Sequence, residues 1–186
     1  MKLVNHTPQQ GFTLVEVLIA FVILSFGLLG AVALQAKAKQ ASFDSMQRAA
    51  AVALGNDIIQ RIRANDRVAA ITQYNGTFTS DTELEQSRTC YSDACNSAQI
   101  AALDRQQWIR AIQAKENTGA LDDATVCIEN TAVPNSDDKA FNIQVVVSWQ
   151  GRQKFTGTTE TQQLTCGESN SNRRIMVLKS YIYLRS

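Results

Sequence analysis

The chain has 186 residues, 45% of them hydrophobic, and its 18 basic and 17 acidic side chains give a formal net charge of +1. This near balance leaves no basic stripe for a phosphate backbone, so the sequence argues against nucleic-acid binding. A chain of this length holds one soluble domain of about 100 to 150 residues besides its N-terminal segment.

An uninterrupted apolar run extends over the 23 residues from Phe12 to Leu34, with Glu16 as its one formal charge. About 20 apolar residues suffice for a helix to cross the hydrocarbon core of a bilayer. A carboxylate inside such a span is unfavourable unless a cation neutralises it. The run therefore predicts a membrane-embedded helix whose single acid has a cationic partner.

The residues before this run differ from an ordinary secretory signal, which places its apolar core ahead of the cleavage site. Here Gly11 precedes the apolar run, so cleavage after it keeps the run in the mature chain. The sequence Gly-Phe-Thr-Leu-x-Glu at 11–16, followed by an apolar helix, resembles the class III leader of type IV pilins and of the related secretion pseudopilins.

This resemblance implies a role for three residues. Gly11 is expected to be the last leader residue read by a prepilin peptidase, and Phe12 the N-methylated mature N-terminus. Glu16 is expected to pair with the α-amine of Phe12, on its own or a neighbouring subunit, and so to set the axial register of a filament. The alternative is that Glu16 lies at the membrane surface as part of an ordinary anchor. Loss of the leader also removes His6, the only histidine, and with it any histidine-based catalytic or metal site.

Beyond the run the pattern predicts that the same helix continues to about Asn65 as an amphipathic spine. The face expected to dock on an apolar surface repeats every four residues: Met46, Ala50, Leu54, Ile58 and Ile62. We expect four segments: a leader peptide at 1–11, a transmembrane or filament-core helix at 12–34, the amphipathic half of the spine helix at 35–66, and a periplasmic head at 67–186.

A second resemblance lies in the spine helix. The sequences at 27–30 (Gly-Leu-Leu-Gly) and 57–65 (Asp-Ile-Ile-Gln-Arg-Ile-Arg-Ala-Asn) resemble PilV-type minor pilins, also called type IV pilus modification proteins. This implies a structural subunit needed for pilus assembly, in a priming or tip complex. The implied partners are other minor pilins, the major pilin, the prepilin peptidase, the inner-membrane assembly platform and a tip adhesin.

The expected location is the inner membrane, spanned once with the head in the periplasm, and the pilus on the cell surface. The positive-inside rule alone argues the reverse, because Lys37, Lys39 and Arg48 follow the span and only Lys2 precedes it. We nevertheless expect a periplasmic head, because the leader is an export leader and the cysteines predict disulfides, which form in an oxidising compartment.

Four cysteines in a chain with an export leader predict disulfides. Three pairings are open, and spacing favours a short loop between Cys90 and Cys95 together with a staple between Cys127 and Cys166. A four-cysteine zinc site needs two closely spaced pairs, whereas Cys127 and Cys166 have no near partners. No metal or other cofactor is expected.

The head is expected to be α+β, a type IV pilin fold with an antiparallel sheet of about four or five strands packed on the spine helix, plus one further helix. A helix is predicted from Asn96 or Ser97 to about Glu116, with Trp108 in the core. Alternation of apolar and polar residues predicts strands, and a polar surface segment is expected before the second helix. The strand ranges are 124–129, 143–149, 154–159, 161–166 and 174–185, and the polar segment is 77–97.

No catalytic constellation is found. The adjacent acids at 122–123 and 137–138 lack the alternating ligand spacing of a calcium loop. The sequence therefore predicts a subunit that is not an enzyme. One alternative is a type II secretion pseudopilin, which shares the leader and helix, and another is a membrane-tethered periplasmic enzyme or binding protein.

Overall fold

The computed structural model describes residues 11–84, 90, 93–137, 139–155 and 157–185. The expected leader at 1–10, and part of the expected polar segment at 85–89 and 91–92, lie outside the described residues. The elements in chain order are α1 (Leu14–Ala64), α2 (Val68–Ile71), η1 (Thr72–Tyr74), β1 (Gly76–Thr79), α3 (Ser97–Asn117), β2 (Asp122–Ala132), β3 (Ala140–Gln150), α4 (Thr159–Gln162) and β4 (Arg173–Tyr183).

The chain divides into two units after Phe43, and α1 contributes to both. The first unit, which ends at Phe43, contains the N-terminal part of this 51-residue helix, including Gly27 and Gly30. The second unit, from Asp44 onward, contains the last part of α1 and all other elements. The predicted helix from Phe12 to Asn65 agrees with the observed one to within two residues at each end.

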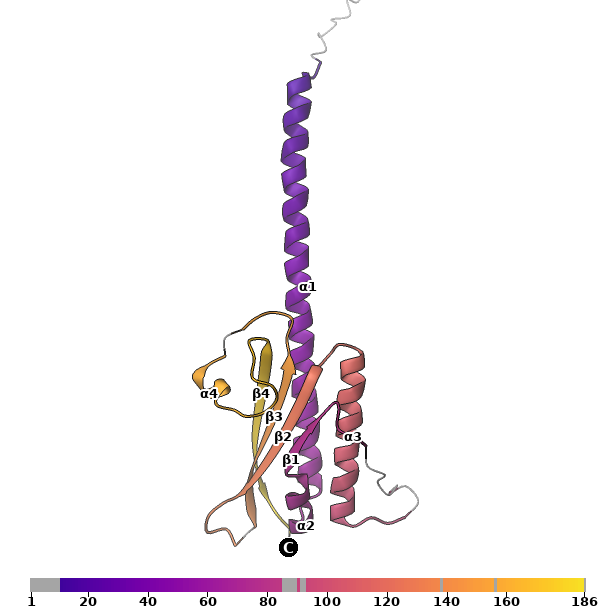
Figure 1. Cartoon of the computed structure of the whole chain (residues 1–186), viewed down its shortest axis with the longest axis vertical. Coiled ribbons are helices and arrows are strands. Elements are labelled where there is room, and N and C mark those ends of the chain that lie inside the picture. Colours follow the sequence, from indigo (N-terminus) through magenta and orange to yellow (C-terminus); the bar gives the residue numbers. More distant parts are fainter. Residues whose placement is uncertain (1–10, 85–89, 91–92, 138, 156, 186) are drawn as a thin grey trace, which may run out of the picture. The chain divides into compact units, whose positions relative to one another are not determined.

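The sheet of the second unit has four strands in the order β1-β2-β3-β4, and every neighbouring pair is antiparallel (Figure 1). Because each strand pairs with the next along the chain, β1 and β4 form the two edges. The predicted α+β class, a long helix with an antiparallel sheet and one further long helix, is confirmed.

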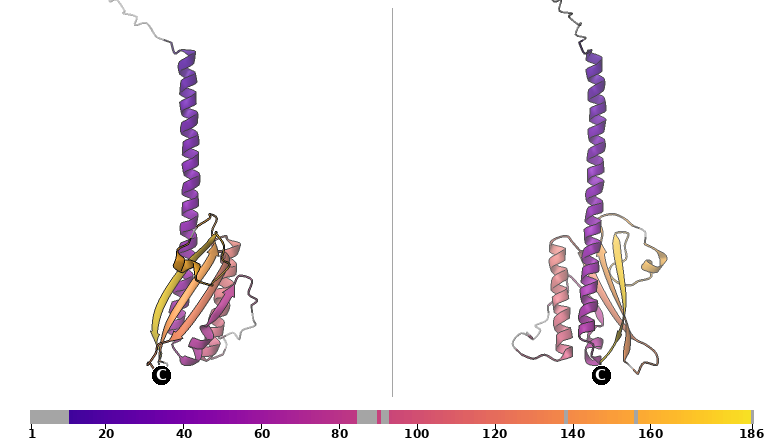
Figure 2. Two further views of the ribbon diagram at one scale, coloured as in Figure 1. Left: turned by 60° about the vertical axis from the view of Figure 1, so that its left-hand side comes forward. Right: turned by 180° about the vertical axis from the view of Figure 1, so that it is seen from behind.

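The last part of α1 and the whole of α3 pack together against one face of this sheet (Figures 1 and 2). Ile58 and Ile62 are fully buried, and Trp108 of α3 lies in the same core. The predicted docking face of α1 is therefore covered, except at its first position, where Met46 is 49% exposed.

Helix α3 begins with a capping box, as its sequence indicates. The Asn96 side chain accepts a hydrogen bond from the Gln99 N–H, and the Gln99 side chain accepts one from the Asn96 N–H. These two bonds satisfy donors that a helix start otherwise leaves unpaired. The helix is thus fixed at the start that the sequence predicts.

Strand β4 follows the last part of α1 in a series of contacts. A Cβ added at Gly55 would lie 2.8 Å from side-chain atoms of both Met176 and Leu178, so glycine lets the two elements approach closely. Further along, Arg63 donates to the Ser180 hydroxyl at 2.9 Å. After the strand, Arg185 forms an ion pair with Asp66 at 2.7 Å.

Two of the predicted strands are wrong. The ranges 154–159 and 161–166 lie in the connection between β3 and β4, and β3 pairs directly with β4. The short helix α4 is the only element among the described residues of this connection. The Arg173 guanidinium accounts for part of this, because it donates to the backbone carbonyls of Thr161, Leu164 and Cys166. A neighbouring strand would need the carbonyls that this side chain occupies.

The expected polar surface at 77–97 is also partly wrong. Residues Gly76–Thr79 form the edge strand β1, and Phe78 is buried with its ring stacked against Trp108 at 6.3 Å between centroids. One inward aromatic in a four-residue strand is too little for a recognisable alternation. The strands predicted at 124–129, 143–149 and 174–185 are present as β2, β3 and β4 with shifted ends.

Candidate assembly surface

The start of α1 is fixed by Thr13 and Glu16. The Thr13 hydroxyl accepts from the Glu16 N–H at 3.3 Å, and the Glu16 carboxylate accepts from the Thr13 N–H at 3.5 Å. Thr13 also supplies the carbonyl that accepts the first helical bond, from Val17. This is a capping box, a function of Thr13 that the sequence analysis missed although the spacing Thr-x-x-Glu signals it.

Gly11 and Phe12 precede this cap in non-helical backbone, and both are exposed. The Phe12 ring is 86% exposed, so neither residue packs against the described part of the chain. Glu16 lies in the first turn of α1, four residues after Phe12.

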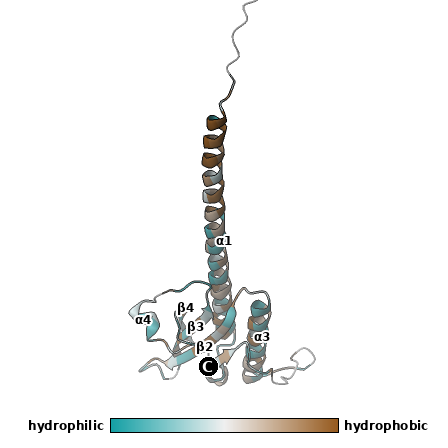
Figure 3. Ribbon diagram, turned by 45° about the horizontal axis from the view of Figure 1, so that its top comes forward, coloured by the Kyte–Doolittle hydropathy of each residue, from teal (hydrophilic) through white to brown (hydrophobic). Residues whose placement is uncertain are grey.

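From Phe12 to Leu34 the large apolar side chains are all exposed. One window of 18 residues in α1 has a mean hydropathy of 2.8 and none of it is buried, so α1 is long and apolar enough to cross a membrane. Figure 3 shows this apolar stretch in brown at the start of α1. The exposed side chains are Phe12, Leu14, Val15, Val17, Leu18, Ile19, Phe21, Val22, Ile23, Leu24, Phe26, Leu28, Leu29, Val32 and Leu34.

Exposed apolar area of this extent is uncommon on soluble proteins and marks a surface that another phase or another molecule covers. Within it, Ser25 donates its hydroxyl to the Phe21 carbonyl at 2.7 Å, so this polar group is satisfied inside the helix. Glu16 is the only ionisable side chain between Phe12 and Leu34. The surface thus combines a wide apolar area with one carboxylate near its start.

The four cysteines form two disulfides, Cys90–Cys95 and Cys127–Cys166. This is the pairing that spacing favours. Cys127 lies in β2 between Val126 and Ile128, which are buried in the core. Because successive side chains of a strand point to opposite faces, the Cys127 side chain points to the face of the sheet away from that core. The second disulfide therefore fastens the connection between β3 and β4 to the sheet face that α1 does not cover.

A polar network joins α1 to α3 and η1. Arg61 pairs with Asp57 at 2.9 Å and with Asp104 at 3.0 Å, and Asp57 accepts from the Trp108 indole at 3.0 Å. The sequence predicted no such network. Only the spacing of Asp57 and Arg61, four residues apart on one helix, indicates part of it in the sequence.

The same network encloses a tyrosine. Tyr74 donates its hydroxyl to Asp104 at 2.6 Å and accepts from Asn65 at 3.1 Å. Burial raises the pKa of the Tyr74 phenol, and the hydrogen bond to Asp104 raises it further. The network therefore holds Tyr74 neutral and fixes α3 on the end of α1. Among the described residues, no three His, Cys, Asp or Glu side chains are grouped to hold a metal ion.

Two family models match the chain. The prokaryotic N-terminal methylation motif matches residues 7–32, which contain Gly11, Phe12 and Glu16. The type IV pilin Tt1218 model, of the Tt1218-like family, matches residues 33–106, from the end of the apolar run into α3. The two ranges adjoin and together cover residues 7–106. No curated protein and no solved structure matches the chain.

Proposed function

Since the chain is a type IV pilin by its N-terminal motif, its fold and its family matches, we propose that it is a minor pilin needed for assembly of the type IV pilus. It acts as a structural subunit, in a priming or tip complex with other minor pilins. The observation that carries this proposal is the exposed apolar part of α1. Its side chains need to be covered by a membrane before assembly and by neighbouring helices after it.

In this proposal the prepilin peptidase cleaves after Gly11, and Phe12 becomes the N-methylated first residue. Residues 12–34 span the inner membrane once and later enter the filament core, while the head, at 67–186, lies in the periplasm. The exposed cleavage site and the well-formed start of α1 support this order of events.

Glu16 then pairs with the α-ammonium group of Phe12 on a neighbouring subunit. Its carboxylate accepts from the Thr13 N–H at 3.5 Å, and two carboxylate oxygens have capacity for further donors. A carboxylate in an apolar filament core is stable only when it is paired. The pair therefore sets how far one subunit is displaced along the filament from the next.

The first experiment is deletion of the gene, with surface pili, twitching motility and secretion of folded exoproteins measured in the same strain. Loss of pili and twitching with normal secretion is the expected result. Loss of secretion with intact pili would reassign the chain to a type II secretion pseudopilin.

A second experiment tests Glu16. In Glu16→Ala we expect normal cleavage and membrane insertion, with incorporation into sheared pili at least about tenfold lower, because loss of a buried ion pair leaves the partner ammonium uncompensated. Ser25→Ala is the matched control, since Ser25 satisfies its hydroxyl within the helix. Wild-type incorporation of Glu16→Ala would refute the register pair.

A further inference from the structure

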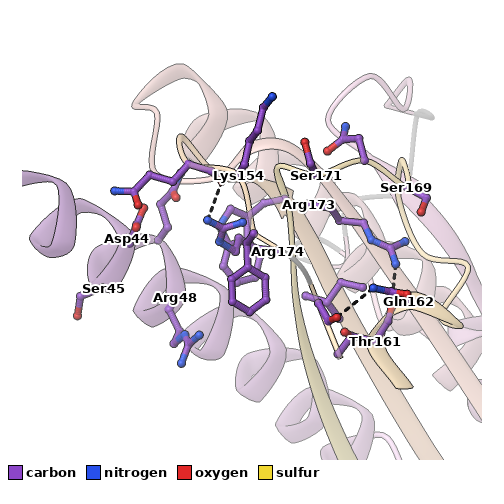
Figure 4. Close-up of a pocket in the computed structure, with 17 residues that line it drawn as sticks. Asp44, Ser45, Arg48, Lys154, Thr161, Gln162, Ser169, Ser171, Arg173 and Arg174 are labelled. Carbon is purple, nitrogen blue, oxygen red and sulfur yellow. Dashed lines mark hydrogen bonds between the residues drawn. The ribbon is translucent and has the colours of Figure 1, made fainter. Parts of the chain in front are cut away.

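A cleft of about 720 Å³ opens in the second unit, between α1 and the connection that joins β3 to β4. Figure 4 shows Asp44, Ser45 and Arg48 of α1 on one side and Thr161, Gln162 and Ser169 of the connection on the other. The proposed assembly function uses none of these residues. A cleft of this size accommodates a drug-sized ligand or a short segment of chain.

The charged side chains that line the cleft are mostly basic. The lining includes one acid, Asp44, and four cations: Arg48, Lys154, Arg173 and Arg174. Arg48 and Lys154 are exposed, and within the described part of the chain no ion pair engages either of them. The cleft therefore presents a net positive charge with two cations available to a ligand.

The two other arginines are fixed in place. Arg173 donates to three backbone carbonyls of the connection, and Arg174 donates to the carbonyls of Gln153 and Asn172. The Arg174 guanidinium carbon lies 5.0 Å from the centre of the Phe155 ring. Neutral carbonyls and an aromatic ring orient these cations without cancelling their charge.

Trp149 adds a buried donor to the same wall. It is the cross-strand partner of Arg174, it lines the cleft, and it is only 3% exposed. Its indole N–H has no hydrogen-bond partner among the described residues. A buried unpaired donor is costly, so this N–H would gain from an acceptor that reaches it.

We propose that this cleft binds an acidic peptide segment carried by another subunit of the assembly. Carboxylates are the acceptors that arginine and lysine recognise best, and Trp149 offers a further donor. Asp44 can in addition accept a backbone N–H, which a peptide supplies. Phe155, 55% exposed, offers apolar contact to the aliphatic stems of glutamates. That the partner is a subunit rests on the proposed function.

Binding is tested with the full chain in a neutral detergent, by fluorescence anisotropy of a labelled octaglutamate peptide. We expect octaglutamate to bind, octaglutamine not to bind, and the affinity to fall with added salt. Lys154→Glu should weaken binding at least about tenfold, the equivalent of one charge-assisted hydrogen bond. Lys179→Glu is the matched control, because Lys179 is exposed in β4 and lies outside the cleft.

Trp149→Phe gives a second, uncharged test. It removes the indole N–H and retains an aromatic ring, so affinity for octaglutamate should fall a few-fold while thermal unfolding confirms the fold. Equal affinities for wild type, Lys154→Glu and Trp149→Phe would overturn the proposal. Binding of inorganic phosphate or phosphatidylglycerol nanodiscs, without binding of octaglutamate, would overturn it in favour of a phosphate site.

In cells, Arg48→Glu should lower incorporation into pili while cleavage and membrane levels stay normal. If gene deletion abolishes pili but both Arg48→Glu and Lys154→Glu assemble normally, the cleft proposal fails and the proposed function stands. If deletion leaves pili intact, the proposed function fails. The octaglutamate assay still tests whether the cleft binds an acidic peptide.

Discussion

The two parts of α1 use apolar side chains in opposite ways. From Leu14 to Leu34 such side chains surround the helix and are exposed, whereas further along five of them are buried in the core: Ala51, Leu54, Ile58, Ile59 and Ile62. The first part carries one charged residue, Glu16, and the second alternates its apolar positions with polar ones. Within one continuous helix, the pattern thus changes from that of a membrane span to that of a spine.

This difference shows that helix formation and burial are separate outcomes. Both parts are helical, but only the second has a sheet of its own chain to pack against. The first part has to obtain its packing from a membrane or from other subunits. Substitutions in the second part should therefore change the free energy of unfolding of the head, and substitutions in the first part should not.

The largest expected effect comes from a matched pair of truncations. Ile58→Ala removes a fully buried side chain and should lower the free energy of unfolding of the head by about 2 to 5 kcal/mol. Ile23→Ala removes an exposed one and should leave it unchanged. Urea denaturation of the full chain in detergent, followed by tryptophan fluorescence, measures both. Equal losses would contradict the division of α1.

The disulfides extend the comparison to the sheet. In the loop-entropy view, the Cys127–Cys166 bond, with a sequence separation of 39, stabilises by about 4 kcal/mol, and Cys90–Cys95, with a separation of 5, by about 2 kcal/mol. Replacing each pair by alanine should give losses in that order in the same urea assay. A larger loss for the Cys90/Cys95 pair would show that the staple does not restrain the sheet.

Two glycines in α1 sharpen the contrast. Gly55→Leu introduces a side chain where Met176 and Leu178 leave no room, so the head should lose about 1 to 3 kcal/mol of unfolding free energy. Gly27→Leu meets nothing within 4 Å and should leave the head unchanged. Full stability of Gly55→Leu would mean that β4 can move away from α1.

Alkaline pH tests the network at the end of α1. The raised pKa keeps the Tyr74 phenol protonated in the fold, while an unfolded tyrosine ionises near pH 10. The unfolded state then binds fewer protons, so stability should fall above about pH 10 by up to about 1.4 kcal/mol per pH unit. Tyr74→Phe should flatten this slope, and the exposed Tyr181→Phe should keep it. An unchanged slope in Tyr74→Phe would contradict the role of burial.

The sequence predicted those features that depend on local pattern. The run from Phe12 predicted the bare part of α1, the four-residue repeat predicted its covered part, and alternation located β2, β3 and β4. The leader motif also located Gly11, Phe12 and Glu16 in a stretch that the methylation-motif family matches. The roles of these three residues in assembly stay predictions.

Features that depend on distant partners were not predictable in the same way. The connection after β3 has enough alternation to suggest strands, but the Arg173 side chain and the Cys166 disulfide fix it in another conformation. Asp104 gave no local sign of its contact with Tyr74, 30 residues away. The basic cleft joins residues near 48, 154 and 174, which no short window brings together.

The contacts between α1 and β4 have a mechanical consequence. Gly55 meets Met176 and Leu178, Arg63 meets Ser180, and Asp66 meets Arg185, so the two elements advance in the same direction along the chain. A force applied along the last part of α1 acts parallel to this row of contacts. Such a force would shear these contacts together instead of opening them one at a time.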